Sequence, residues 1–479
     1  MDFPLFYLDL IGNRLMLAII AITHVLINHP LAVGAYPLVV FMEWWGQRTK
    51  NPEWDQLAYR VTFVLFIITT SIGALTGVGI WLSAGLISPF GIGSLLRVFF
   101  WAWFTEWLVF ISEVVLIVLY FLLWKRWTAG SRRKLHLAVG VILSVMSWFT
   151  MAIIVGILGF MMGTGSWTTD HTLFSAFLNP LYLPQLAFRT AYALMAGGLT
   201  VWFLMFFFTK KGTEFRQKAV RLVASWSLIL APICAAGALW YWSAVPTVMK
   251  NNLDVGMLTQ NFQQWHQTFL IVIAVVIGVI LLVGLTAVIR PKLIPSFVLI
   301  IPFVFGLYLL GHFERVREFI RKPHVVANYM YSNGVTMDEL PVFQRDGLLR
   351  YATYVRNHQV TSTNKISAGQ DVFMIACSRC HTTGGVNSVV KKFRKLYGDG
   401  EWSDDAMGSF LATMHVTRQY MPPFPGNDAE AEALVAFIKD LKATGRTVTG
   451  VQMDGIPQPP PEAVAPEATA RLQGGNNDN

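Results

Sequence analysis

Long apolar runs separated by short polar stretches fill the first two thirds of the chain. They lie at about residues 14–42, 58–86, 94–124, 134–162, 183–209, 217–243, 264–289 and 294–318. A helix crosses a bilayer with about 20 apolar residues, so each run is long enough to span one. Lipid offers the backbone no hydrogen-bond partner, and the spans should therefore be helices. The pattern predicts an all-α fold, a polytopic membrane bundle of about eight spans.

The pattern changes after the last run, and four regions follow from it. We expect a transmembrane domain over 1–324, a polar linker with short helices over 325–360, and a small all-α domain over 361–445. The stretch 429–438 is typical of an amphipathic helix, with Asn427 or Asp428 as its N-cap. Residues 446–479 are rich in Pro, Ala and Asn and should be disordered.

The charge pattern predicts how the spans are oriented. The chain is 54% hydrophobic and 14% charged, with a net charge of +9. Basic residues gather in the loops after the first, third, fifth and seventh spans, whereas 163–182 has none. By the positive-inside rule these basic loops are cytoplasmic, so the N-terminus and the C-terminal domain lie outside. The charge thus reflects the bilayer and does not indicate nucleic acid, and the first run should be an uncleaved anchor.

Residues 377–381 read Cys-Ser-Arg-Cys-His, the attachment signature of a c-type haem. Cys377 and Cys380 would bind the haem vinyl groups, and His381 would ligate the iron. Met421 is the expected sixth ligand, because a thioether there raises the reduction potential. Haem c is attached on the outer side of bacterial or organellar membranes, which agrees with the charge pattern. The prediction is a bacterial inner-membrane protein with a periplasmic cytochrome c domain.

Other interpretations of these residues stay open. His415 is a competing sixth ligand for the haem iron. The two cysteines of the signature could instead form a disulfide. The third, Cys234, lies within an apolar run and is expected to be a small buried hydrophobic residue.

Two carboxylates lie inside the third span. Glu106 and Glu113 are seven residues apart, so they share a helix face about 10 Å apart along the axis. Ionisable groups in a membrane are costly and usually mark function. The pair suits a proton path, or one haem contact and one proton donor. Hydrogen bonding to neighbouring Trp or Ser side chains is the structural alternative.

Histidines and the end of the last span supply further candidates. The first span holds His24 and His29, and imidazole is a common iron ligand, although a membrane His can also be a hydrogen-bonded core residue. Glu314 and Glu318 share one face of the last span. Arg321 and its basic neighbours could pair with haem propionates, or simply form a solvated helix end. His136, at the start of the fourth span, is expected at the surface.

The chain resembles subunit I of the cytochrome bd oxidases over most of residues 10–324. The stretch 24–34 is similar to the family's His-x₅-Pro-Leu-x-x-Gly, which implies that His24 ligates an active-site haem. The stretch 110–113 resembles the family's Phe-Leu-Glu, whose carboxylate lies on a proton path, and the match falls on Glu113. The stretch 318–323 is similar to Glu-x-Gly-Arg-Gln-Pro, which implies that Glu318 ligates a high-spin haem b.

The departures from the family pattern concern the low-spin haem and quinol. Arg189 falls near the position of the family's low-spin haem b ligand, a His, and the second ligand, a Met, has no counterpart. Either this haem is missing or His171 and His266 hold it. The loop 244–263 is short and lacks the family's quinol-binding motif. The fused haem c offers a replacement route for electrons.

Three functions are compatible with these features. The first is a bd-like oxidase that receives electrons through haem c and reduces O2 or a similar small oxidant. The second is a quinol dehydrogenase that passes electrons outward through haem c. The third is a non-catalytic cytochrome c relay subunit of a larger respiratory complex. We expect one covalent haem c and one or more haems b, and haem d is a further candidate. The expected partners are a second membrane subunit and a cytochrome c or other periplasmic redox protein. Quinone is a further partner if the chain is a quinol dehydrogenase.

Overall fold

The computed structural model describes residues 6–128, 130–257, 266–448 and 450–451. Their contacts divide the chain into two compact units. One unit comprises Ile20–Gly79 and Leu96–Ile320, and the other comprises Met1–Ile19, Ile80–Leu95 and Arg321–Asn479. The two units are described separately below.

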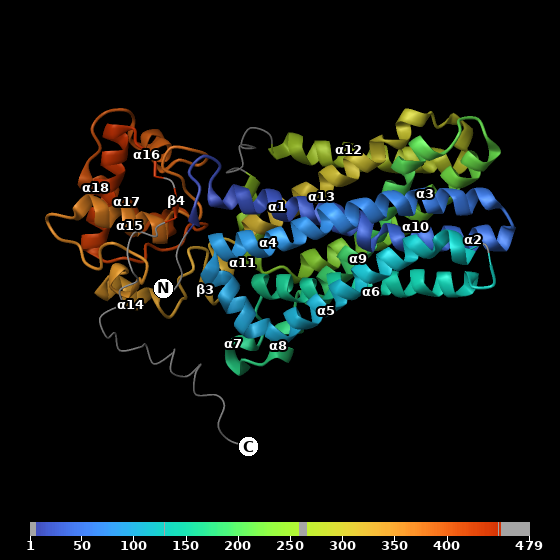
Figure 1. Cartoon of the computed structure of the whole chain (residues 1–479). Coiled ribbons are helices and arrows are strands. Elements are labelled where there is room, and N and C mark those ends of the chain that lie inside the picture. Colours follow the sequence, from blue (N-terminus) through green and yellow to red (C-terminus); the bar gives the residue numbers. More distant parts are fainter. Residues whose placement is uncertain (1–5, 129, 258–265, 449, 452–479) are drawn as a thin grey trace, which may run out of the picture. The chain divides into compact units, whose positions relative to one another are not determined.

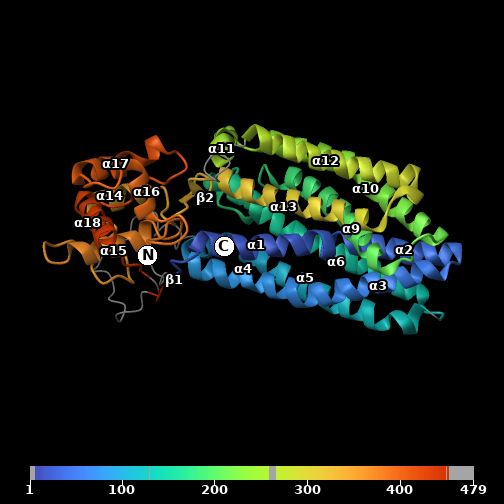
Figure 2. The same cartoon turned by 90° about the horizontal axis from the view of Figure 1, so that it is seen from above.

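Eight helical spans are present among the described residues, as predicted. The first two spans are each a helix pair joined by a π-helical segment: α1 (Asn13–Ile27), η1 (Asn28–Val33) and α2 (Ala35–Thr49), then α3 (Pro52–Ile68), η2 (Thr69–Gly73) and α4 (Ala74–Ile87). The others contain α5 (Pro89–Thr128), α6 (Arg133–Met162), α9 (Tyr182–Phe208), α10 (Glu214–Ala244), α12 (His266–Ile289) and α13 (Ile301–Ile320). Figures 1 and 2 show the long helices running side by side.

The turn between the first two spans shows how local sequence ends and starts helices. Lys50 adopts a left-handed conformation that closes α2. Asn51 then caps α3, because its side-chain oxygen accepts a hydrogen bond from the backbone N–H of Glu53 at 3.0 Å. Pro52 occupies the first helical turn, where its missing N–H costs nothing.

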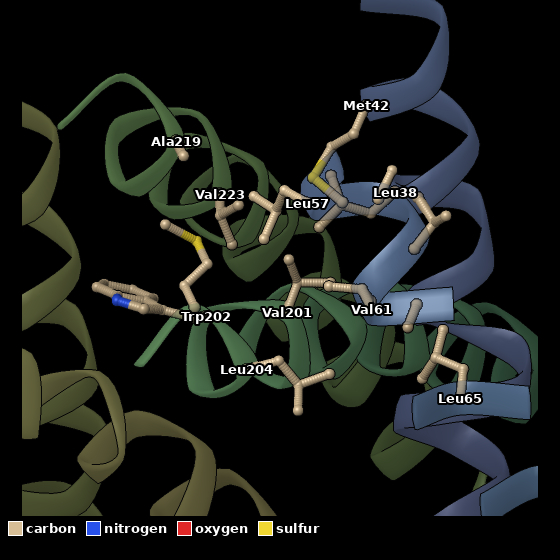
Figure 3. Close-up of a cluster of buried hydrophobic side chains, with 14 of the residues drawn as sticks. Leu38, Met42, Leu57, Val61, Leu65, Val201, Trp202, Leu204, Ala219 and Val223 are labelled. Atoms are coloured by element: carbon tan, nitrogen blue, oxygen red, sulfur yellow. The ribbon is translucent and has the colours of Figure 1, made fainter. Parts of the chain in front are cut away.

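Helix α9 is the centre of the membrane unit and packs against α2, α6, α10 and α13. Its Val201, Trp202 and Leu204 are buried against apolar side chains such as Leu38 and Val61 (Figure 3). Burying each such side chain contributes about 1.5–3 kcal/mol in water, whereas in lipid close packing supplies the gain.

Two glycines allow the backbones of the first span and α9 to touch. A Cβ added at Gly34 would overlap the carbonyl of Ala193, and one added at Gly197 would overlap the carbonyl of Gly34. Small residues permit this close approach between membrane helices. The contact fixes η1 against α9, which brings polar side chains of both segments together.

Short helices that the apolar pattern did not predict lie between the spans: α7 (Trp167–Asp170), α8 (Leu173–Phe177), α11 (Thr247–Met257) and η4 (Pro291–Leu293). The eighth span begins with η5 (Ser296–Leu299). Thr172 caps α8 through its side chain. Except for α11, which has 11 residues, these helices have three to five residues and are too short to produce a hydrophobic period that a sequence pattern could reveal.

The C-terminal domain contains α15 (Lys365–Ala376), α16 (Val389–Tyr397), α17 (Asp404–Thr417) and α18 (Asp428–Thr444) (Figure 1). Helix α15 packs on α18 through buried residues that include Val372, Phe373 and Phe437. Asn427 caps α18 and forms a capping box with Glu430, so the predicted amphipathic helix and one of its two proposed caps are present.

The expected linker is folded against this domain. It contains β2 (His324–Val326), β3 (Met330–Tyr331), α14 (Leu340–Asp346) and η6 (Leu349–Tyr351). Phe343 and Leu349 join the apolar core of the C-terminal domain. The carboxylate of Glu430 accepts hydrogen bonds from the backbone N–H groups of Leu348 (2.8 Å) and Leu349 (2.7 Å). These bonds satisfy backbone donors that a polar-looking segment would otherwise expose to water.

The N-terminal segment belongs to the same unit. Strand β1 (Phe6–Tyr7) pairs antiparallel with β4 (Gly450–Val451). The start of the stretch expected to be disordered therefore forms a strand, and residues 452–479 of that stretch lie outside the described residues. Asp9 accepts hydrogen bonds from the N–H and the hydroxyl of Thr383, two residues after the haem c signature.

Candidate haem-binding sites

A tight turn at the end of α15 gathers the haem c signature. The backbone N–H groups of Cys380 and His381 both donate to the carbonyl of Cys377, at 3.1 and 2.9 Å. Cys377 and Cys380 are free thiols, so the disulfide alternative is not what the structure has. Two thiols and an imidazole thus project from a single turn, as attachment of one haem requires.

His381 is oriented through one of its ring nitrogens. Its Nδ1 donates to the carbonyl of Asn387 at 3.3 Å, and the side-chain amide of Asn387 donates to the carbonyl of Cys380 at 2.6 Å. A hydrogen bond at Nδ1 leaves Nε2 for a metal. Burial lowers the pKa of His381 to about 4, which keeps the imidazole neutral, the form that binds iron.

His415 lies in the last turn of α17, and Met421 follows that helix. Met421 packs against the same apolar core as Cys377. The imidazole Nδ1 of His415 donates to the backbone carbonyl of Met421 at 2.6 Å. This bond uses Nδ1 and leaves Nε2 for a metal, so His415 stays the competing sixth ligand beside Met421. This donor set, with two thiols, one oriented imidazole and a nearby thioether, fits a haem c.

His24 lies in α1, one turn before η1. Its Nδ1 is 3.2 Å from the hydroxyl of Thr76, which lies just after η2. A Cβ added at Gly77 would come within 3.2 Å of His24 Cε1, so the glycine leaves room for the ring. π-Helical segments often occur at functional sites, and two of them flank this pair. The Nε2 atom is the one available to a metal, and the arrangement fits an axial haem ligand.

Glu113 of α5 is buried and accepts two hydrogen bonds from α6, from Ser147 Oγ (2.7 Å) and Thr150 Oγ1 (3.0 Å). Glu106 is half-buried, two turns away on the same helix. The hydrogen bond from Ser147 is what we expected if Glu113 has a purely structural role. The proton-path role of both carboxylates stays a prediction.

The end of α13 carries the remaining candidates. Glu318 is half-buried, and Arg321, just beyond the helix, is buried. Their roles toward a haem also stay predictions. The buried carboxylate on this helix is Glu314, whose Oε1 accepts from Arg189 Nη2 at 2.6 Å and whose Oε2 accepts from Arg317 Nε at 3.0 Å.

Arg189 joins the first, fifth and eighth spans. Its Nη1 lies 2.9 Å from Nε2 of His29, and its guanidinium lies over the ring of Phe313 at 5.5 Å. Both Arg189 and His29 are buried. An arginine held in this way cannot supply the nitrogen that an axial haem ligand must supply, so these residues do not fit a low-spin haem b.

The two histidines considered as substitutes are His171 and His266, and their role toward a low-spin haem b stays a prediction. His171 is exposed and meets Trp167 edge-on at 5.2 Å. The side chain of His266 lies outside the described residues. Cys234 is buried among apolar side chains, as expected.

The expectation that His136 lies at the surface is wrong. It is fully buried, with Nδ1 at 2.9 Å from Glu43 Oε1 and Nε2 at 2.9 Å from the carbonyl of Tyr120. Its basic neighbours along the sequence suggested exposure, but the ring points inward. The signal for Glu43 and Tyr120 was present: Glu43 follows the first apolar run directly, and Tyr120 lies seven residues after Glu113.

Two comparisons with known proteins found a similarity: one matches the C-terminal domain, and the other is to a solved membrane-protein structure. Residues 364–438 match the family described as cytochrome c oxidase, cbb3-type, subunit III. The fold is similar to that of a bd oxidase from Geobacillus thermodenitrificans, with 15% identity and a TM-score of 0.53 over 66% of this chain and 89% of that chain. No curated protein matches the chain.

The haem c signature at 377–381 lies within the residues that match a cytochrome c family, which implies a covalent haem c. The eight apolar helices make the chain a multi-pass membrane protein. It is a membrane haem electron-transfer protein, in which a bundle with the bd-oxidase fold precedes a cytochrome c domain.

Proposed function

We propose that this chain is the catalytic subunit of a bd-like oxidase that receives its electrons through haem c. The observation that carries the proposal is the ion pair between Arg189 and Glu314, at 2.6 Å. It occupies the position near which the resemblance puts a low-spin haem ligand. Without that haem, a quinol has no ordinary first acceptor in the bundle. The attached cytochrome c domain is then the route by which electrons arrive.

The balanced reaction is O2 + 4 e⁻ + 4 H⁺ → 2 H2O, with electrons from a reduced one-electron donor outside the membrane. Haems bound in the bundle would supply the redox chemistry. They would be of type b, with type d as the alternative. His24 would hold one of them through Nε2, and Glu318 would hold another, with Arg321 pairing with a propionate. A similar small oxidant could replace O2.

In this proposal the two carboxylates on α5 conduct the protons that the reaction consumes. Glu113 accepts hydrogen bonds from two hydroxyl groups, those of Ser147 and Thr150, which hold its carboxylate against α6. Glu106 follows about 10 Å along the helix. The two carboxyl groups would pass protons toward the haems.

The charge pattern supports the orientation of the proposed enzyme. Basic residues follow α2, α5, α9 and α12, which favours a cytoplasmic location for that end of the bundle. The haem c domain would then lie on the periplasmic side of a bacterial inner membrane. A periplasmic cytochrome c or similar protein would be its redox partner, and a second membrane subunit would complete the complex.

Spectra of the purified protein test the proposal. Dithionite-reduced and CO-difference spectra should reveal a CO-reactive haem besides haem c, and a pyridine haemochrome assay should give its type. Oxygen uptake should be supported by a reduced small electron donor and lost in Cys380→Ser.

Low-spin haems b and c with no CO response would contradict the proposal and favour a quinol dehydrogenase. Haem c alone would favour a relay subunit.

A further inference from the structure

A second polar network lies buried at the end of the membrane unit that carries the basic loops. Tyr120 of α5 donates its hydroxyl to Glu43 Oε2 of α2 at 2.8 Å, and His136 of α6 lies 2.9 Å from Glu43 Oε1. All three side chains are fully buried. The rings of Tyr120 and His136 stack at 4.5 Å. Every carboxylate oxygen and both imidazole nitrogens are hydrogen-bonded.

Stability alone does not explain such a network. Burying a carboxylate and an imidazole costs several kcal/mol before their attraction is counted, and packed apolar residues often do as well or better. The surroundings are built for it nevertheless. A Cβ added at Gly140, one turn after His136, would collide with the Tyr120 ring. Ionisable groups kept at this cost within a membrane usually move charge or protons.

Toward the aqueous end, the network has a partly exposed neighbour. Asp55 of α3 accepts two hydrogen bonds from Arg133, at 2.7 and 2.6 Å, and both side chains keep about a quarter of their surface exposed, 23% and 28%. Asp55 also interacts electrostatically with Glu43 and His136. Protons in solution can therefore reach a carboxylate next to the buried network.

Toward the interior of the bundle, Tyr120 lies on the same helix, α5, as the two carboxylates of the proposed proton path. Glu106, Glu113 and Tyr120 follow one another at intervals of seven residues, so they share one face about 10 Å apart. Tyr36 meets Tyr120 edge-on at 6.4 Å and interacts electrostatically with Glu113. Titratable side chains thus extend from Asp55 to Glu106.

We propose that Glu43, Tyr120 and His136 form the relay that delivers protons from the basic-loop end of the bundle to Glu113. The proposal rests on the function above. A proton taken up beside Asp55 would be held by the Glu43–His136 pair and released through the hydroxyl of Tyr120. Water and the hydroxyl of Tyr36 would carry it over the remaining distance, since proton transfer needs hydrogen-bond reach or one bridging water per step. Each proton used in oxygen reduction is replaced by one from solution.

The test is proton uptake during a single turnover. The fully reduced protein is mixed with O2 in weakly buffered solution that contains a pH-indicator dye. Glu43→Gln and Tyr120→Phe should each slow proton uptake by about tenfold or more, with haem content and reduced spectra unchanged. Glu43→Asp, which keeps the carboxylate, should recover much of the rate. Glu53→Gln removes an exposed carboxylate at the same end of the bundle and should match the wild type.

Proton uptake within about twofold of wild type in both Glu43→Gln and Tyr120→Phe would overturn the relay. If Glu43→Gln loses haem, Tyr120→Phe decides, because it removes only a hydroxyl. A wild-type protein that consumes no O2 contradicts the proposed function instead. The relay is then judged from proton uptake during anaerobic haem reduction, which the two variants must still slow.

Discussion

Arg189 and Glu314 form a buried ion pair between the fifth and eighth spans, with Nη2 of the arginine donating to Oε1 of the carboxylate at 2.6 Å. Arg317 binds the second carboxylate oxygen at 3.0 Å, so two buried guanidinium groups share the single negative charge of Glu314. The cluster crosses the bundle and holds His29 of the first span as well. It does structurally what a haem with two axial ligands does in a bundle, which is to tie several helices together.

Glu314→Gln should strongly destabilise the membrane unit. The change leaves two buried cations without their counter-charge, and losing one partner of a buried pair costs about 3–5 kcal/mol. Thermal unfolding in detergent should shift accordingly. The matched control is Lys218→Ala, which breaks an exposed i,i+4 pair with Glu214 and should cost no more than about 0.5 kcal/mol. Equal effects of the two changes would contradict the structural role.

Met421→Leu should remove the sixth ligand of haem c without removing the haem. The charge-transfer absorption of a sulfur-ligated ferric haem should disappear, and the reduction potential should fall because a thioether favours the ferrous state. His415→Ala should keep that absorption, although it loses a hydrogen bond to the Met421 carbonyl. A wild-type protein that lacks this absorption, and whose haem spectrum changes in His415→Ala but not in Met421→Leu, would make His415 the ligand.

His24→Ala should abolish one membrane haem signal and leave covalent haem staining on a denaturing gel intact. Thr76→Val should retain the haem but alter its spectrum, since it removes only the hydroxyl 3.2 Å from His24 Nδ1. Reduced-minus-oxidised spectra of the two variants separate these effects. An unchanged spectrum in His24→Ala would exclude this residue as a ligand.

Acidification should loosen the contact between Asp9 and Thr383. Burial by itself raises the pKa of Asp9, but hydrogen bonds from Tyr7, Thr383 and Gly384 outweigh it and hold the pKa below the ordinary 3.8. A depressed pKa contributes stability above the unfolded value and loses it as pH falls through the folded value. Stability should therefore decline below pH 3.8, and Asp9→Asn should show a weaker decline. Identical acid profiles would argue against this contribution.

The spans and the haem c signature could be predicted from the sequence because both are local. A span requires a continuous apolar run, and residues 377–381 form one turn whose chemistry does not depend on distant segments. The N-cap at Asn427 is local in the same way. The linker was underestimated because its burial depends on Glu430, about 80 residues further along the chain.

The sequence by itself determined that this chain crosses a membrane eight times and carries a covalent haem c, since hydrophobic length and the Cys-x-x-Cys-His spacing are properties of short segments. Only the tertiary structure decided which ionisable groups meet. Glu43 and His136 are 93 residues apart, and Arg189 and Glu314 are 125 apart. Helix packing, made tight by residues such as Gly34 and Gly197, brings them within hydrogen-bond distance. Helix packing determines which residue pairs with a buried charge, and the local sequence pattern does not predict that pairing.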